Sequence, residues 1–209
     1  IYTVLYSPKN PDTKKCTKSE VKPGADFTSC PKDSLRGASL SNANGSNIKL
    51  AGLDLTGTNF TGANLSHAQM AATNLTGTNL GQTNLTSADL RNATYDKTQL
   101  GDAELAGALL NGAHSLGNIV GTPKSMPGWT AIRNGYLISP EATLKAAKLA
   151  NADLSNFSLT HAILTDSDLS GANLTSADLS GAVLRGANLT RANLSGAVLK
   201  GANLSGATW

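Results

Sequence analysis

Hydrophobic residues recur at every fifth position along most of the chain. Stepping by five from Leu35 to Leu110 gives sixteen positions, and all of them except Gly45 hold a large apolar residue. A second register runs from Leu144 to Trp209 and contains fourteen positions, thirteen of them Leu and the last Trp. Two residues before each of these positions the side chain is usually Ala or Thr, and the residue between is commonly Asn or Asp. The first three side chains of each repeat are therefore expected to point inward, outward and inward again, and two mostly polar residues follow them.

This spacing excludes an α-helix, because five steps of about 100° would scatter the leucines around the whole circumference. A straight strand would explain the alternation but would continue it without a polar pair. A bend in every repeat satisfies the pattern. A chain that bends in this way winds into a coil whose neighbours stack at the strand spacing of ~4.8 Å. The sequence therefore predicts a solenoid, whose stability is a sum of interactions between neighbouring coils.

The repeats also resemble a known family. Strings such as Ala172-Asn173-Leu174-Thr175-Ser176 and Ala187-Asn188-Leu189-Thr190-Arg191 are similar to the A(D/N)LXX motif of pentapeptide-repeat proteins, and the resemblance covers both registers. It implies an all-β fold, a right-handed quadrilateral parallel β-helix with about twenty residues in each coil and ~35 Å of rod. We expect a first repeat array at 35–112 and a second at 142–209.

The two registers are separated by an interruption, for which we give the bounds 113–141, because Leu110 and Leu144 lie 34 residues apart rather than a multiple of five. Asn134-Gly135 is a favoured pair for a tight turn and predicts a protruding β-hairpin.

Two interpretations of this hairpin stay open. Its lone aromatics, Trp129 and Tyr136, fold back and fill the discontinuity of the rod, since such side chains usually pack. Alternatively the hairpin contacts a partner through Trp129, Arg133 and Tyr136. The resemblance supports the second interpretation, because family members directed at DNA gyrase use loops that project from the rod.

Residues 1–34 fit the repeat poorly and are expected to form an N-terminal cap, since an uncapped coil exposes leucines and strand edges. Cys16 and Cys30 are the only cysteines, and a disulfide between them would staple a segment that has little core of its own. The alternative is two free or buried thiols, and a metal site is not expected without a CxxC pair or an adjacent His. A disulfide predicts an extracytoplasmic or secreted protein, whereas thiols would allow a cytoplasmic one.

At the other end the sequence stops within a repeat, at Ala207-Thr208-Trp209. We expect either that the natural chain continues or that two rods meet end to end through this coil as a homodimer. The resemblance implies the second arrangement, because dimeric family members associate in this way.

The charge excludes some partners. The formal net charge is +3, and the basic excess is confined to residues 1–36. No stripe of Lys and Arg marks a nucleic-acid interface, so no nucleic-acid partner is expected. The longest apolar run, at residues 1–6, is far shorter than the ~20 residues that a spanning helix needs, so no membrane span is expected.

Candidate chemistry is sparse. His67, His114 and His161 are not spaced as metal ligands, and Asp166 and Asp168 are expected to line solvated faces. A pocket formed by His161, Asp166 and Asp168 is the one arrangement that would favour an enzyme. No catalytic triad or phosphate-binding loop accompanies them. We therefore expect no catalytic residue, no metal and no cofactor.

These observations favour a non-enzymatic structural or protein-interaction module, a rigid rod with an unidentified protein partner. The resemblance offers an alternative, a modulator of DNA gyrase that mimics DNA, although mimicry needs a strongly negative surface. A third possibility is an ice- or polymer-binding face made of Thr ladders. The pattern does not sustain such a ladder, since at twenty-residue spacing Thr56 and Thr76 are followed by Asp96.

Overall fold

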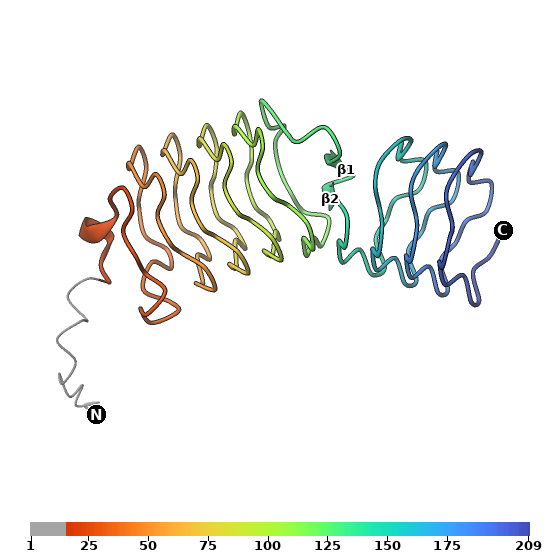
Figure 1. Ribbon diagram of the computed structural model, residues 1–209, viewed down its shortest axis with the longest axis horizontal. Coiled ribbons are helices and arrows are strands. Elements are labelled where there is room, and N and C mark those ends of the chain that lie inside the picture. The colour runs from red at the N-terminus through yellow and green to blue at the C-terminus, as the bar shows by residue number, and fades with distance from the viewer. Residues whose placement is uncertain (1–15) are drawn as a thin grey trace, which may run out of the picture.

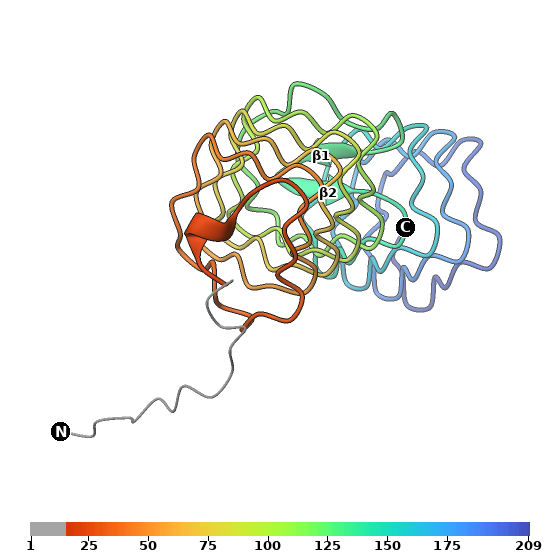
Figure 2. The ribbon, with the colours of Figure 1, turned by 60° about the vertical axis from the view of Figure 1, so that its left-hand side comes forward.

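The chain winds in successive coils along one long axis (Figure 1), and a turned view shows the coils stacked one behind another (Figure 2). The computed structural model describes residues 16–209, so that residues 1–15, including the apolar run and part of the expected cap, lie outside the described chain. Regular elements within the described residues are the 3-10 helix η2 (Lys18–Glu20) and the strands β1 (Ala131–Arg133) and β2 (Tyr136–Ile138). The described chain therefore contains almost no helix.

Neighbouring coils are joined by single parallel bridges between residues twenty positions apart, as in the ladder Asn44–Asn64–Asn84. Each side of a coil adds backbone hydrogen bonds around its bridge. On the Asn64 side, Leu65 N–H donates to Asn84 O at 2.8 Å, and Asn84 N–H donates to Ala63 O at 2.9 Å. The bends between bridges prevent longer strands. Twenty residues correspond to four five-residue repeats, which agrees with the coil length that the family resemblance implies.

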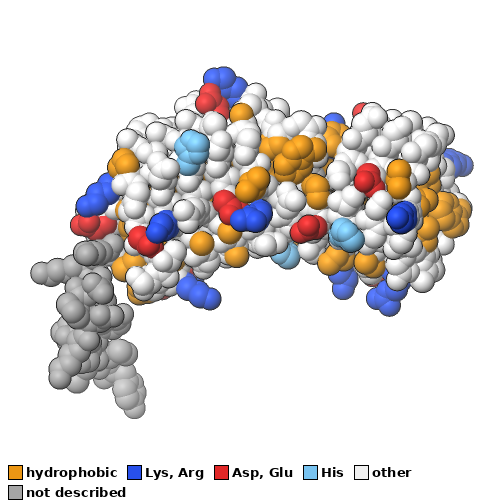
Figure 3. Space-filling view, in the orientation of Figure 1, with side chains coloured by type: hydrophobic (Ala, Val, Ile, Leu, Met, Phe, Trp, Pro, Cys, Tyr) orange, Lys and Arg blue, Asp and Glu red, His pale blue; other side chains and the backbone are white. Residues whose placement is uncertain are grey.

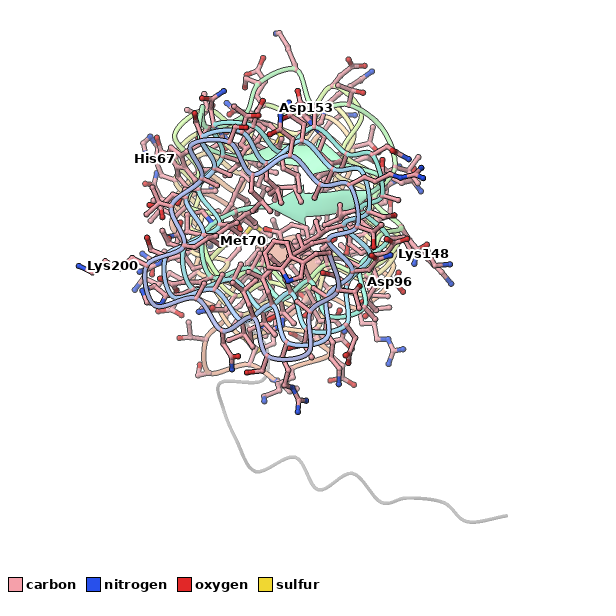
Figure 4. All side chains as sticks on the ribbon, turned by 90° about the vertical axis from the view of Figure 1, so that its right-hand side faces the viewer. His67, Met70, Asp96, Lys148, Asp153 and Lys200 are labelled. Carbon is pink, nitrogen blue, oxygen red and sulfur yellow. A yellow bond between two sulfur atoms is a disulfide. The ribbon has the colours of Figure 1, made fainter. Side chains whose placement is uncertain are left out.

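The large apolar position of each repeat points into the rod, and Leu55, Phe60 and Leu65 are completely buried. In a view along the rod, Met70 lies near the middle of the cross-section, whereas His67 and Lys200 lie at its perimeter (Figure 4). Leucines of neighbouring coils therefore stack on one another, as the pattern predicts.

The small inward position holds either Ala or a buried Thr. Thr58, Thr78 and Thr98 are completely buried, and each hydroxyl donates to a backbone carbonyl of the preceding coil at 2.7 to 2.8 Å. Because the hydroxyls are satisfied in this way, they are compatible with an apolar interior.

The outward Asn or Asp of a repeat stabilises the bend that follows it. Asn59 Oδ1, for example, accepts the backbone N–H and the hydroxyl of Thr61, at 2.9 and 2.6 Å. One residue further on, the chain adopts a left-handed conformation, in which Gly62 has φ +68°. The preference for Asn or Asp, and then for Gly or a polar residue, follows from this turn geometry.

The described part of the N-terminal segment pairs with the first coils. Cys16 and Cys30 form a disulfide with an S–S distance of 2.05 Å. Asp26 bridges Lys49 in parallel, and Phe27 is completely buried beneath this pairing. No helix between residues 16 and 209 is both long and apolar enough to cross a membrane.

Candidate functional site: the interruption of the rod

The stack of coils is broken on most of its sides between the two arrays. One ladder continues across the break, through Thr94, His114, Thr143 and Ile163. The other ladders of the second array start at Lys148, Asp153 and Ser158, and among the described residues none of these three has a bridge to an earlier coil. Three sides of the second array therefore begin with a strand edge that faces the break.

A β-hairpin occupies this break. Asn134 and Gly135 have φ of 50° and 77°, and this left-handed pair connects β1 and β2 in the tight turn that the sequence favours. Seen along the rod, the two strands lie across the interior of the coils rather than outside them (Figure 4). The hairpin is thus inserted into the rod and does not protrude, which corrects the sequence-based expectation.

The two faces of β2 belong to different hydrophobic cores. Leu137 is part of the core of the first array, against which Ile132 of β1 also packs. Tyr136 and Ile138 are part of the core of the second array. Since side chains alternate along a strand, one short strand closes two cores at once. The hairpin therefore forms a partition between the arrays.

Tyr136 is buried, with 8% of its surface exposed. Its ring lies so close to Gly117 that a Cβ on this glycine would stand 2.3 Å from the ring carbon Cζ. Its hydroxyl accepts the backbone N–H of Lys148 at 3.1 Å, and so replaces the carbonyl that a preceding coil would have supplied. Tyr136 is thus used inside the molecule and is not available to a partner.

The tip of the hairpin covers the strand edge of the second array with side chains. Arg133 Nε donates to Asp153 O at 2.8 Å, and the guanidinium lies 5.2 Å from the ring centroid of Phe157. Asn134 Nδ2 donates to Lys148 O at 3.1 Å. Edge strands that are covered in this way do not pair with other chains. The contacts of Arg133 are therefore internal, and a partner-contact role stays a prediction that rests on Trp129.

Phe157 was not recognised from the sequence, although a signal existed, because it stands at an inward position where the second array nearly always has Ala. The nearby Asp153 accepts the hydroxyl and the backbone N–H of Ser155. These hydrogen bonds, together with the charge of Arg133, lower the pKa of the Asp153 carboxyl against the opposing effect of desolvation. Asp153 therefore stays ionised beside the hairpin tip.

Four exposed large apolar side chains occur in the segment that leads into and through the interruption. Trp129 is 37% exposed, and Leu109, Leu116 and Val120 are 42, 63 and 59% exposed. Figure 3 shows hydrophobic side chains over the middle of the rod and at its C-terminal end. These three aliphatic residues were not recognised from the sequence. Leu109 carried a signal, because it takes the outward position at which Asn or Asp is common.

The residues considered for chemistry do not form a site. His67 and His161 occupy left-handed turns, and His114 lies in the ladder that crosses the break. Asp168 accepts hydrogen bonds from Ser170 N–H and Asn188 Nδ2. Within residues 16–209, no group of three or more His, Cys, Asp or Glu side chains is arranged to hold a metal ion. The second array has a shallow hollow of about 370 Å³, and His161, Asp166 and Asp168 do not line it. Its lining consists of Asn151, Ser170, Gly171, Asn188, Thr190 and Arg191.

Stacked five-residue repeats with inward leucines and a partitioned core define a repeat protein built of coils. The family model of pentapeptide repeats matches the chain in eight copies, at residues 34–66, 63–98, 141–175 and 177–208. The chain belongs to the pentapeptide-repeat family.

Solved structures are similar to this chain, whereas no curated protein matches it. HetL, a pentapeptide-repeat protein of Nostoc sp. strain PCC 7120 involved in the regulation of heterocyst differentiation, is 32% identical; 83% of this chain and 73% of HetL are covered, with a TM-score of 0.36. A second pentapeptide-repeat protein from Nostoc, alr5209, is also 32% identical over 46% of this chain and 72% of its own, with a TM-score of 0.38. QnrB1, a plasmid-mediated fluoroquinolone resistance protein, is 17% identical over 87% of this chain and 88% of its own, with a TM-score of 0.34.

Proposed function

We propose that this protein is a non-enzymatic interaction module, a right-handed quadrilateral β-helical rod that contacts a protein partner at the interruption between its two arrays. The observation that carries the proposal is the exposure of four large apolar side chains, Leu109, Leu116, Val120 and Trp129, within one stretch of the chain. Leu109 and Val120 lie in the ladders of Asp89 and Gln99, on opposite sides of the coil, so the proposed contact is centred on the residues within the interruption, above all Trp129.

The faces of the coils support this choice of site by contrast. Their outward positions are mainly polar, and many of the Asn and Asp side chains there accept hydrogen bonds from their own turns, as Asn74 does from Thr76. These side chains therefore stabilise the turns of the rod. Trp129 is partly exposed, and its indole N–H makes no hydrogen bond within residues 16–209, so it is the aromatic side chain best suited to anchor a partner.

A photo-crosslinking amino acid at position 129 tests the proposal in extracts of the source organism. We expect one discrete protein adduct, whose yield falls when unlabelled wild-type protein is added in excess. The same competitor with Leu116→Ser, Val120→Ser and Trp129→Ser should fail to reduce the yield. The control places the crosslinker at His67, an exposed turn of the first array. Equal adducts from both positions, or equal competition by the triple variant, would contradict the proposed site.

The gyrase alternative has less support. DNA mimicry needs a strongly negative surface, whereas the chain has a formal net charge of +3. Several acidic side chains are also paired, such as Asp89 with Arg91 and Glu104 with Lys124. We therefore keep gyrase modulation as the weaker hypothesis, and a supercoiling assay with the purified protein tests it directly.

An extracytoplasmic location is the second part of the proposal, and the Cys16–Cys30 disulfide supports it, because such bonds persist in oxidising compartments. Trapping of thiols with an alkylating agent at cell lysis, followed by intact-mass measurement, provides the test. We expect no alkylation of either cysteine. Two alkylated thiols would instead indicate a cytoplasmic protein.

An end-to-end homodimer is the third part. The inward Leu199 and Leu204 of the last coil are only partly buried and Trp209 is 65% exposed, and this apolar surface would be buried in such a dimer. We expect light scattering at high concentration to give twice the monomer mass for the wild type and the monomer mass for Trp209→Ser. A wild-type monomer would contradict the dimer without affecting the site at the interruption.

A further inference from the structure

We propose that the interruption is a hinge: the second array swings as one body about the side of the rod that carries the Thr94–His114–Thr143–Ile163 ladder. The hairpin moves with the first array. The seam between the hairpin tip and residues 148–158 is then the surface that opens and closes.

The backbone bonding across the seam is much weaker than between ordinary coils. Within an array, every side of a coil contributes backbone hydrogen bonds to the next coil, as on the Asn64 side described above. Between residues 16–138 and residues 139–209 the structure has two, from Gly112 N–H to Pro140 O at 2.9 Å and from Thr143 N–H to Ala113 O at 2.8 Å. Both lie beside the continuous ladder. A joint whose backbone–backbone bonds lie along one side only can rotate about that side.

The hairpin is bonded to the two arrays in different ways. On the first-array side, Ile119 N–H donates to Gly135 O at 3.1 Å, and Leu137 N–H donates to Ser115 Oγ at 3.2 Å. On the second-array side, the described bonds use hairpin side chains alone, those of Arg133, Asn134 and Tyr136. Only the first-array side includes a hydrogen bond between two backbone groups, so in this proposal the seam opens on the second-array side, where each bond depends on a side chain.

The partition of the cores allows this motion. Tyr136 and Ile138 close the second core by apolar packing, which is not directional, and the leucines beyond them stack within their own array. A small rotation therefore leaves both cores intact. With this rotation, the bend of the rod adjusts to a bound partner. The strand edge at residues 148–158 is then exposed only in the open state.

Distances between two spin labels measure this motion. Ser87→Cys and Ser176→Cys place labels on exposed turns of the two arrays. These turns follow the ladders of Asn84 and Asn173, half a coil away from the proposed hinge. The native cysteines are joined in the disulfide and do not react. We expect Arg133→Ala combined with Tyr136→Phe to widen the distance distribution roughly twofold, or to add a longer distance, because the seam loses three side-chain contacts.

The matched control is Arg191→Ala, which removes an exposed arginine of the second array far from the seam. It should leave the distribution unchanged. Circular dichroism and a cooperative melt establish that each variant is folded, and a second seam variant, Asn134→Ala, gives an intermediate width if the first unfolds. Identical distributions in the wild type and in folded seam variants would overturn the hinge, as would equal broadening by Arg191→Ala.

Discussion

The buried threonines act as hydrogen-bonded links between coils. Thr78 is completely buried, and its hydroxyl donates to Leu55 O at 2.7 Å. The five-residue pattern predicted that position 78 points inward. It did not predict this bond, because the partner lies 23 residues earlier and its position depends on the length of the coil. The local sequence thus places the Thr inward, and the stacking of coils supplies the carbonyl to which its hydroxyl donates.

Thr78→Val tests this link. Valine keeps the shape but lacks the hydroxyl, so we expect a loss of about 1 kcal/mol in the free energy of unfolding, the usual net value of one buried hydrogen bond. Urea denaturation followed by circular dichroism measures it. Thr86→Val, at a partly exposed outward turn, is the matched control and should change stability little. Equal effects of the two substitutions would show that the bond adds nothing.

Gly117→Ala tests the close packing of the partition. The new Cβ would stand 2.3 Å from Tyr136 Cζ, whereas a Cβ on Gly57 would meet no atom within 4 Å. Both glycines have positive φ, 86° and 67°, so the backbone strain is similar. We expect Gly117→Ala to destabilise the protein by about 1–3 kcal/mol more than Gly57→Ala, because the ring must shift. Thermal melts of the two variants compare them.

At the scale of the element, the bends contain carboxyl groups whose pKa values are lowered by hydrogen bonds from the turn. The Thr28 hydroxyl and backbone N–H, with Lys49, hold the pKa of Asp26 at about 2. Hydrogen bonds from Ser170 and Ser180 lower the pKa values of Asp168 and Asp178. A carboxyl whose folded pKa is lowered stabilises the protein above its unfolded pKa of about 4, and this stabilisation is lost as the pH falls through the folded value.

The melting temperature should therefore fall as the pH decreases from about 4 to 2. Asp168→Asn combined with Asp178→Asn should weaken this dependence, because Asn accepts the same turn hydrogen bond, as Asn59 does, without titrating. Differential scanning calorimetry at several pH values measures both proteins. A double variant that loses as much stability in acid as the wild type would contradict the assignment.

The disulfide stabilises the described part of the N-terminal segment. It closes a loop with a sequence separation of fourteen residues, for which the chain-entropy estimate is about 3 kcal/mol. We expect Cys16→Ser with Cys30→Ser to make trypsin cleave faster after Lys18 and Lys32, while cleavage within the arrays changes little, since each coil depends mainly on its neighbours. Limited proteolysis with mass spectrometry measures this, and equal cleavage rates in both proteins would contradict it.

The hairpin shows how far the sequence could predict an element. Asn134-Gly135 indicated the turn correctly, because the left-handed pair is a local requirement. One of the two interpretations left open, that aromatics fold back into the discontinuity, is confirmed for the buried Tyr136. The division between two cores was missed, since alternation along β2 gives two faces but does not name what each face meets. The exposed Leu109 and the inward Phe157 were visible departures from the repeat, yet only the three-dimensional stack relates them to the hairpin.

For the whole molecule, the repeat predicted the inward leucines and a bend in every repeat, whereas the twenty-residue coil followed from the family resemblance, because a local rule does not set the number of sides. The break was predicted as a change of register that carries a hairpin. Its structural effect is a division into two hydrophobic cores that meet at β2, with Leu137 in the first and Tyr136 and Ile138 in the second. Adjacent residues of one strand therefore support different halves of the rod.

Leu137→Ala and Ile138→Ala test this division. Both side chains are buried, at 1 and 0% exposure, so each truncation should cost about 2–5 kcal/mol locally. Because stability in stacked repeats is carried between neighbours, Leu137→Ala should speed amide exchange mainly in the coils before the break, and Ile138→Ala mainly in the coils after it. Hydrogen exchange with mass spectrometry resolves the two arrays. A single shared core would instead give the same pattern for both variants, so the comparison distinguishes a partitioned rod from a continuous one.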